Sequence, residues 1–321
     1  MSESAQSQWH WHYRVGLALT CLLLLFTLIL LPLTVASAVR DVLGSVMGAQ
    51  FVLSPFPHAA APPTHTDLHI VVADLNEVRQ VATLQVTGYH ICAAPCDWSD
   101  RVRLFSLLNE PWEEGYPPSV RMTLPPSLDA VSQTVELPVL GWPLQYPFDD
   151  YRLRLGLVLE RVGLDGTVEV LPPAEAQGAL FVTVQERLAQ LSMRPPVHLD
   201  RQQVQQAGPP IPYVYVAALE FHRLLYVRVL AVLLVVLLAA AAVYAVFLLP
   251  IRDLAVNATA LTVGIWGIRA VLTPANVTYV TTVDLLLAVV ILILLGASTV
   301  RALLFLHDRS ALPRFWDRHP E

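Results

Sequence analysis

Two groups of side chains have the types and spacing that a metal ion would need. His65, Asp67 and His69 alternate along a stretch that could be extended, so their side chains would share one face and could bind zinc or copper. A second group could bind calcium weakly but lacks the alternating oxygen ligands of an EF-hand loop: Glu110, Glu113 and Glu114. The alternative for both groups is a set of exposed polar residues, and we favour it because the histidines adjoin a linker. We therefore predict no metal and no cofactor.

The sequence contains none of the common signatures of catalysis. It has no Gly-x-Ser-x-Gly, no phosphate-binding glycine loop, no His-Glu-x-x-His and no dinucleotide fingerprint. Cys92 and Cys96 lack the Cys-x-x-Cys spacing of a thioredoxin-type redox site. A disulfide can close this short loop if the chain turns at Pro95, and it would indicate an oxidising compartment; two unpaired thiols are the alternative. We expect the disulfide, expect Cys21 to be a buried apolar residue, and predict no enzymatic activity.

Four long apolar runs indicate the elements that anchor these groups. One run lies near the amino terminus and three lie near the carboxyl terminus: Val15–Ala38, Val229–Leu249, Leu254–Thr273 and Val283–Val300. A helix needs about 20 apolar residues to cross a bilayer, so each run predicts a transmembrane helix. With their flanks, these helices are expected at residues 15–38, 223–250, 251–274 and 279–306. The first run could instead be a cleaved signal peptide, but it exceeds the about 7 to 15 apolar residues of such a peptide, so we favour an uncleaved anchor.

Charge separates the middle of the chain from its ends. The protein has 321 residues, of which 55% are hydrophobic and only 14% are charged. Residues 41–222 hold ten arginines and twenty acidic side chains, a net charge of −10, which argues against nucleic acid as a partner. Six arginines flank the helices on the side of the termini and four flank the other side, which favours cytoplasmic termini (1–14 and 307–321) and an extracytoplasmic middle domain. A basic tail is expected to contact anionic lipid, through Arg301, His307, Arg309, Arg314 and Arg318.

Short alternating segments indicate that the middle domain is made of strands. After a Pro- and Ala-rich linker at 39–65, apolar and polar residues alternate with the period of two that half-buried strands have. From Tyr151 to Leu159 the odd positions are apolar, while Arg152 and Arg154 face the other way. Strands are expected near 68–75, 81–87, 102–107, 120–124, 135–139, 151–159, 180–185 and 211–217, and residues 184–193 could form one short helix. This pattern predicts an antiparallel β-sandwich at 66–222, and hence an α+β membrane protein with one N-terminal and three C-terminal helices.

One turn in this domain has an unusually specific sequence, which runs from Gly141-Trp142-Pro143 to Tyr146-Pro147-Phe148-Asp149. Pro147 holds Tyr146 extended, so that Phe148 can insert into a core. Asp149 can accept bonds from backbone amides of the turn or pair with an arginine such as Arg152. A structural corner and a turn that couples the domain to the helices both fit this sequence. Three residues before the second apolar run either take part in such coupling or form a solvated cluster: Glu220, His222 and Arg223.

The turn resembles a feature of the pentameric Cys-loop ligand-gated channels. Tyr146-Pro147-Phe148-Asp149 is similar to the Phe-Pro-x-Asp or Tyr-Pro-Phe-Asp turn of that family, and Leu272-Thr273-Pro274 with Thr278 to Asp284 is similar to the linker after the second membrane helix of its anion-selective members. The resemblance implies that the turn contacts this linker and couples ligand binding in the domain to the state of a pore. The chain departs from that family because no cysteines bracket the turn, an extra helix precedes the domain and a fourth helix after it is missing. Over nearly its whole length the chain resembles a family of bacterial and fungal membrane proteins with an amino-terminal anchor, a Tyr-Pro-Phe-Asp-bearing domain and three carboxy-terminal helices, which implies no particular activity.

The third apolar run carries a polar stripe. Its members recur at i, i+3, i+7, i+10 and i+14 and therefore share one helical face: Thr259, Thr262, Trp266, Arg269 and Thr273. We favour internal packing, with threonines bonded to their own backbone, Trp266 filling a gap and Arg269 reaching the outer surface. The alternative is the lining of a path that favours anions. Asp284 begins the last run on the same side as Arg269, and because either charge would be costly alone, we predict that the two form an ion pair.

These observations favour an integral membrane protein of the cell envelope whose extracytoplasmic domain binds, senses or scaffolds without catalysis. The alternative is a channel-like subunit of a homo-oligomeric ligand-gated pore, in which residues 146–149 contact residues 273–282 and ligand binding opens a path along Thr259, Thr262 and Arg269. A third class, a metal-dependent envelope enzyme, rests only on the two histidines and the aspartate described first. The sequence identifies the lipid bilayer as a partner and identifies no ligand.

Overall fold

The chain folds into two compact units, one of helices and one of strands. The computed structural model describes residues 3–44, 48–55, 62–93, 96–107, 118–126, 129–200, 211–248, 250–272 and 280–311. The helical unit comprises residues 1–39, 144–147 and 225–321, and the strand unit comprises residues 40–143 and 148–224. Some residues singled out above lie outside the described residues or have no described side chain: Glu110, Glu113, Glu114, Thr273, Arg309, Arg314 and Arg318.

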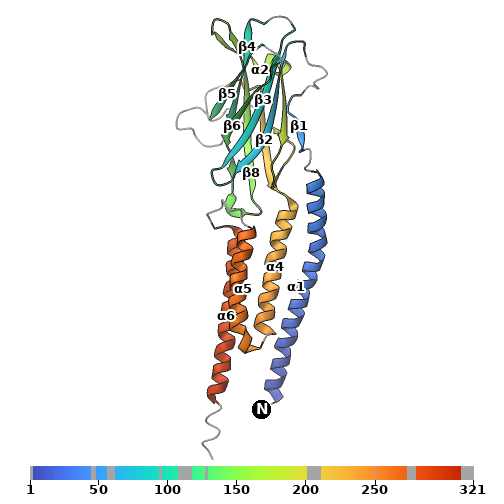
Figure 1. Cartoon of the computed structure of the whole chain (residues 1–321), viewed down its shortest axis with the longest axis vertical. Coiled ribbons are helices and arrows are strands. Elements are labelled where there is room, and N and C mark those ends of the chain that lie inside the picture. The colour runs from blue at the N-terminus through green and yellow to red at the C-terminus, as the bar shows by residue number, and fades with distance from the viewer. Residues whose placement is uncertain are drawn as a thin grey trace, which may run out of the picture. The chain divides into compact units, whose positions relative to one another are not determined.

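Two β-sheets make up the strand unit (Figure 1). The first has the order β1-β10-β2-β3-β6, with bounds β1 Gln50–Val52, β10 Leu180–Glu186, β2 His65–Asn76, β3 Val81–Ile91 and β6 Val131–Pro138. The second has the order β11-β13-β8-β4-β5, with bounds β11 Leu191–Met193, β13 Tyr215–Arg223, β8 Asp150–Gly163, β4 Trp98–Ser106 and β5 Ser119–Leu124. Short strands extend the second sheet: β7 Leu140–Gly141 and β9 Val168–Val170 pair with β8, and β12 Val197–His198 pairs with β13.

The alternation of side chains along the strands gives the two sheets one common core. Ile70 of β2, Leu84 of β3, Leu153 of β8 and Phe221 of β13 are all fully buried and belong to one apolar cluster. Burying each such side chain stabilises the fold by about 1.5–3 kcal/mol. The predicted β-rich middle domain is therefore confirmed as two sheets around a shared apolar core.

Three expectations for the strand unit are wrong. The sheets are not wholly antiparallel, because β2 and β10 run parallel, with Leu68 opposite Val182. The predicted linker contains β1, which pairs with β10 and is followed by the buried Leu53. Residues 184–193 end β10 and form β11 instead of a helix, and the α-helix that the described residues of this unit contain is α2, Pro173–Ala179. Only seven residues long, α2 is too short for a helical period to be recognised in the sequence.

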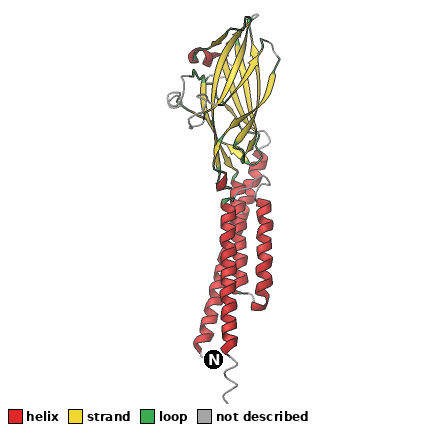
Figure 2. Cartoon of the chain, turned by 90° about the vertical axis from the view of Figure 1, so that its left-hand side faces the viewer, coloured by secondary structure: helices red, strands yellow, loops and turns green. Residues whose placement is uncertain are grey.

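Long helices make up the other unit: α1 Glu3–Gly44, α4 Leu225–Phe247, α5 Ile251–Leu272 and α6 Thr282–Ala311. Three segments within the described residues are long and apolar enough to cross a membrane, namely Arg14–Arg40, Leu225–Phe247 and Thr282–His307. α5, which corresponds to the predicted span at 251–274, is not among them. Figure 2 shows the long helices running side by side, and α4, α5 and α6 contact one another and share one apolar cluster. Leu28 and Leu292 are 68% and 70% exposed, as expected of helices surrounded by lipid.

The first helix buries a stripe of small and hydroxyl side chains that the sequence analysis did not identify. Gly16, Thr20, Thr27 and Thr34 are buried, whereas Cys21, expected to be buried, is exposed. Each threonine hydroxyl donates to a backbone carbonyl three or four residues earlier, so its polar atoms are satisfied within the helix. A Cβ atom at Gly16 would lie 2.7 Å from the Cβ of Phe247, so the glycine allows α1 to approach α4.

Candidate functional site

Two neighbouring strands place ionic clusters on opposite faces of the second sheet. In the antiparallel pair of β8 and β13, Asp150 lies opposite His222 and Arg152 lies opposite Glu220. These four side chains share the outer face, because alternate residues of a strand point to opposite sides. Asp149 and Arg223 have the other parity and are buried on the core face. The same two strands therefore build an open cluster and a buried one.

Arg223 is the centre of the buried cluster. Its Nε donates to Asp149 Oδ1 at 3.1 Å, and its Nη2 donates to Asp149 Oδ2 at 3.1 Å, which is a bidentate pair. Nη2 also pairs with Glu77 in the turn between β2 and β3, and Nη1 donates to Gln190 Oε1 at 3.4 Å. Arg223 is 3% exposed and Asp149 is 0% exposed. Each charge therefore depends on its partners, since water cannot replace them.

Burial and neighbouring charges shift the pKa values in this cluster. Burial raises the pKa of Glu77, and this outweighs the lowering effect of Arg223. Burial also raises the pKa of Tyr151 far above its usual range, and the charges of Asp149 and Glu77 add to that rise. Burial alone would lower the pKa of Arg223, but its bonds to Asp149 and the charges of Asp149 and Glu77 raise it. Arg223 therefore stays charged and Tyr151 stays protonated at physiological pH.

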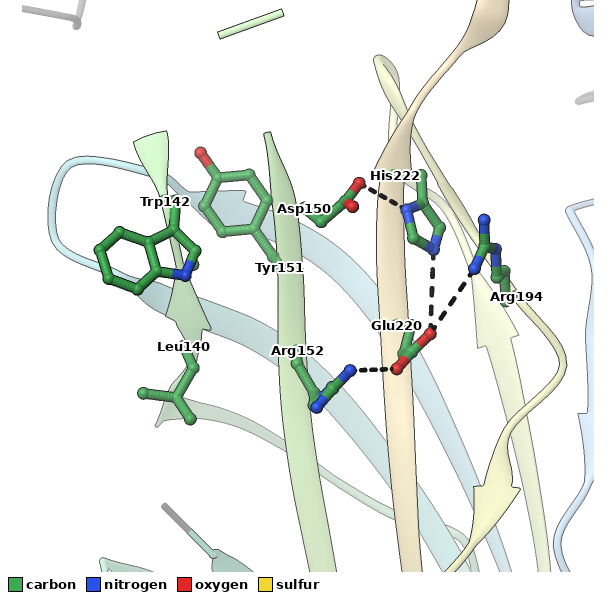
Figure 3. A pocket seen from close by; sticks show the side chains of 9 residues that line it. Leu140, Trp142, Asp150, Tyr151, Arg152, Arg194, Glu220 and His222 are labelled. Atoms are coloured by element: carbon green, nitrogen blue, oxygen red, sulfur yellow. Dashed lines mark hydrogen bonds and ion pairs between the residues drawn. The ribbon is translucent and has the colours of Figure 1, made fainter. Parts of the chain in front are cut away.

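The open cluster lines a cavity of about 370 Å³ on the second sheet. Figure 3 shows its ion pairs as a connected chain. Asp150 Oδ1 lies 2.5 Å from His222 Nδ1, and His222 Nε2 lies 4.0 Å from Glu220 Oε2. Glu220 in turn lies 2.6 Å from Arg152 Nη2 and 3.8 Å from Arg194 Nη1. The two arginines are 49% and 65% exposed, so the positive end of this chain is open to solvent.

The remaining wall of the cavity is mostly apolar. It is formed by Leu140, Gly141, Trp142 and Tyr151, and the Trp142 side chain is 70% exposed. A Cβ atom at Gly141 would lie 2.1 Å from Tyr151 Cδ1, so only glycine lets the Tyr151 ring lie against the β7 backbone. The described lining offers charges of both signs and an aromatic surface, and no serine, cysteine or lysine is among its residues. Such a lining suits the binding of a small polar molecule or a peptide side chain.

The sequence Tyr146-Pro147-Phe148-Asp149 contributes to both units in turn. Tyr146 is 4% exposed and belongs to the apolar cluster of the helices, with Val283 of α6. In the same unit, Thr282 Oγ1 donates to the carbonyl of Leu144 at 3.1 Å, and the bond between Tyr146 and Pro147 is cis. Phe148 is 42% exposed, so the expectation that it inserts into a core is wrong. Asp149 pairs with Arg223 and not with Arg152, whose partner is Glu220.

The polar stripe of α5 is not packed inside the helical unit. Thr259 is exposed, and Trp266 is 64% exposed instead of filling a gap. Thr262 donates to the carbonyl of Ala258 at 2.8 Å, as expected of a threonine bonded to its own helix. The buried face of α5 is apolar, with Leu254, Ala258 and Ile265. A Cβ atom added at Gly264 or Gly267 of the same helix would have no atom within 4 Å, so both glycines face open space.

Arg269 and Asp284 lie together, as the sequence analysis predicted. Arg269 Nε lies 2.5 Å from Asp284 Oδ1. Asp284 also caps α6, because its Oδ2 accepts from the backbone amide of Thr281 at 2.9 Å and its own amide donates to Thr281 Oγ1 at 3.3 Å. The Thr-x-x-Asp sequence before an apolar run was the signal for this cap, and the sequence analysis missed it.

Within the described residues, His65, Asp67 and His69, which were considered as a possible metal site, do not come together as a set of three ligands. His69 binds Thr183 Oγ1 at 2.8 Å and Gln185 Oε1 at 3.2 Å through its two ring nitrogens, and His65 Nε2 lies 3.5 Å from Asp67 Oδ2. Cys92 and Cys96 are joined as a disulfide, as expected. Within the described part of the chain, the group whose ligand atoms do lie close together consists of His90, Cys92 and Cys96.

Sequence reasoning missed the partners that make these clusters. Asp149 and Arg223 are 74 residues apart, and no local pattern links them. The alternation of side chains along the strand could have revealed the pair. Arg223 stands at a position where this alternation places a buried side chain, and a buried arginine needs an acidic partner. No protein-family model matches the chain, and no curated protein matches it. The functional assignment therefore depends on the geometry described above.

Proposed function

We propose that this chain is an integral membrane protein of the cell envelope whose strand unit, an extracytoplasmic β-sandwich, binds or senses a ligand without catalysis. The main support for the proposal is the path of the chain after Pro143. In this short segment Tyr146 packs in the cluster of the helices, Asp149 belongs to the buried ionic cluster, and Asp150 lines the open cavity. A ligand that rearranges Asp150 or Glu220 would act beside Arg223, which lies two residues before α4 begins.

The orientation in this proposal is supported by two independent features. A disulfide between Cys92 and Cys96 suits an oxidising compartment outside the cytoplasm. The arginines that flank the helices favour cytoplasmic termini. α5 crosses the membrane with α1, α4 and α6 in this proposal, because its charge at Arg269 is neutralised by Asp284.

Labelling in intact cells tests the orientation. Leu164, 84% exposed in the turn between β8 and β9, is replaced by cysteine in a Cys21→Ser background; His307→Cys, in the exposed last turns of α6, is the control. A membrane-impermeant maleimide should label L164C in intact cells and H307C only after permeabilisation. The reverse pattern would place the strand unit in the cytoplasm and contradict the proposal.

Thermal shift of the detergent-solubilised full chain tests the binding site. Amino acids, short peptides and small organic ions are the probes, and a ligand of the cavity should raise the unfolding temperature of the wild type. Glu220→Gln and Arg194→Gln should abolish the shift, because both side chains line the cavity. Arg79→Gln should keep it, because its exposed pair with Glu136 lies on the first sheet. Shifts that survive both cavity substitutions would contradict binding at this site.

A second candidate function is a subunit of a homo-oligomeric ligand-gated pore. It is favoured by the exposed face of α5, where Trp266 is 64% exposed and where Gly264 and Gly267 have open space that another helix could fill. The contact of Thr282 with Leu144 also resembles the turn-to-linker contact of the pentameric channels. This candidate requires a ring of subunits with α5 at its axis. Native mass spectrometry and particle symmetry in detergent decide it, since a monomer or dimer excludes a pore.

A further inference from the structure

A second buried polar cluster lies in the strand unit, next to the Cys92–Cys96 disulfide. Thr66 of β2 and His90 of β3 are cross-strand partners in the first sheet, and Asp100 lies on β4 of the second sheet. The three residues are 0%, 2% and 2% exposed. His90 Nδ1 lies 2.9 Å from Thr66 Oγ1 and 3.0 Å from Asp100 Oδ2. The other ring nitrogen, Nε2, lies 3.0 Å from Cys92 Sγ.

The hydrogen bonds fix which nitrogen of His90 carries the proton. Thr66 Oγ1 donates its single proton to Asp100 Oδ2 at 2.6 Å, because a carboxylate can only accept. The Thr66 oxygen must then accept from His90, so Nδ1 carries the hydrogen. The neutral ring therefore directs the lone pair of Nε2 at Cys92 Sγ. Metal-binding histidines are usually oriented in this way, with one ring N–H held by a polar group and the other nitrogen offered to the metal; for His90 the polar group is the Thr66 hydroxyl, which is itself bonded to Asp100.

The two sulfur atoms complete a set of three ligands. His90 Nε2, Cys92 Sγ and Cys96 Sγ all lie within 4.8 Å of one another. Ligand atoms about 2.0–2.3 Å from a shared metal ion are roughly 3.5–4 Å apart when three of them surround it in a plane. The sulfurs are bonded at present, but their Cα atoms are 6.2 Å apart, so side-chain rotation can separate the sulfurs once the bond is broken. Both cysteines are half-buried and thus accessible to a reductant and an ion.

We propose that reduction of the Cys92–Cys96 disulfide opens a site for one copper(I) ion, bound by His90, Cys92 and Cys96. A dithiol breaks the S–S bond, each sulfur gains one electron and one proton, and the dithiol is oxidised to its own disulfide. Copper(I) then displaces the two thiol protons, which pass to solvent, and the metal keeps its oxidation state. Two soft thiolates and one imidazole are the donors that copper(I) prefers. When another disulfide accepts two electrons from the two thiolates and becomes a dithiol, the Cys92–Cys96 bond forms again and the ion is released.

Copper titration of the reduced full chain tests this site. The Cys21→Ser protein in detergent is reduced with a water-soluble phosphine, which takes up the oxygen of water as it becomes a phosphine oxide. After removal of the phosphine, copper(I) is titrated without oxygen against a chromophoric copper(I) chelator. The reduced protein should retain one copper per chain, and the oxidised protein should retain none. X-ray absorption of the copper form should show two sulfur ligands and one imidazole nitrogen.

Substitutions assign the ligands and their support. Cys96→Ser should abolish retention, and Asp100→Asn should weaken copper affinity about 10- to 100-fold, because the carboxylate orients His90. Circular dichroism of each oxidised variant shows whether the strand unit is folded. The proposal is overturned if the reduced protein binds no copper, or if its copper has sulfur ligands only. Those two readings use the reduced protein with all three ligands present and so do not depend on whether a ligand variant folds.

Discussion

Arg223 and Arg152 belong to the same pair of strands and both bind carboxylates, yet their surroundings differ. Arg223 is buried and holds Asp149 and Glu77 through one guanidinium. Arg152 has a side chain that is 49% exposed, and among the described residues it pairs with Glu220. Water and salt can replace the partner of an exposed charge but not that of a buried one. The two arginines therefore offer a matched comparison of buried and exposed pairing.

Replacing Arg223 with glutamine should strongly destabilise the strand unit. The change leaves Asp149 buried without its cation, which typically costs about 3–5 kcal/mol. Arg152→Gln removes an exposed pair and should cost less than about 1 kcal/mol. Denaturant unfolding of the full chain in detergent, followed by near-ultraviolet circular dichroism, measures both. Equal losses in the two variants would mean that the buried cluster contributes no special stability.

Gly141 should tolerate no side chain, because the Tyr151 ring occupies the space that a Cβ atom would need. Gly141→Ala must displace this buried ring, and such overpacking costs about 1–3 kcal/mol. Gly178→Ala is the control: no atom lies within 4 Å of the added Cβ, and alanine favours the α2 helix. The same unfolding experiment should show a loss for the first variant and none for the second. An unchanged G141A protein would show that the ring is free to move.

Several of the strands that the sequence predicted have a clear period of two. β3 and the first half of β8 alternate between buried and more exposed residues, and their positions follow from that pattern. β9 and β12 were missed because their residues are exposed throughout, and two or three residues cannot carry a period. The parallel pairing of β2 with β10 joins segments more than 100 residues apart, and alternation within a strand carries no information about its neighbour.

The turn at Tyr146 shows a second limit of local patterns. An aromatic after a proline reads as a core residue, but here Tyr146 is buried and Phe148 is 42% exposed. The reason is that Tyr146 packs in the helical cluster, which is built from residues at least 80 positions further along the chain. The pairing of Arg269 with Asp284 was predictable because charges at the facing ends of consecutive helices have few other partners.

A double-mutant comparison tests the pair of Arg269 and Asp284. Asp284→Asn should lower the yield of folded protein several-fold, because an unpaired arginine in a membrane helix costs about 2.5–3.5 kcal/mol. Adding Arg269→Gln should restore part of the yield. Recovery should be incomplete, because Asp284 also caps α6. Size-exclusion chromatography of detergent extracts measures the folded yield.

Asp253→Asn is the control for this comparison. Asp253 is exposed in the first turn of α5, so its loss removes only a favourable interaction with the helix dipole. Its yield should stay near that of the wild type. A double variant no better than Asp284→Asn would show that the two charges are not energetically coupled, whatever their separation.

The two units are joined by more than the ends of the chain. Between Pro143 and Phe148 the chain leaves the strand unit, contributes four residues to the helical unit and returns. Tyr146 and Asp149 are three positions apart, yet Tyr146 packs in the cluster of the helices and Asp149 binds Arg223 at the end of β13. In the function we propose, this short segment is the covalent route by which binding on the strands would reach the helices.

Hydrogen exchange should separate the two ends of this segment. Tyr146→Ala removes a buried ring from the helical cluster, so exchange should rise first in peptides from the starts of α4 and α6. Asp149→Asn breaks the bidentate pair with Arg223, so exchange should rise in β8 and β13. Mass spectrometry of the detergent-solubilised full chain resolves these peptides, and Phe148→Ala, with its exposed ring, should change neither set. If both substitutions raised exchange equally throughout the chain, the two units would unfold together as one cooperative fold. A ligand bound to the strands could then not favour one state of the helices over another, and this result would contradict the proposed sensing.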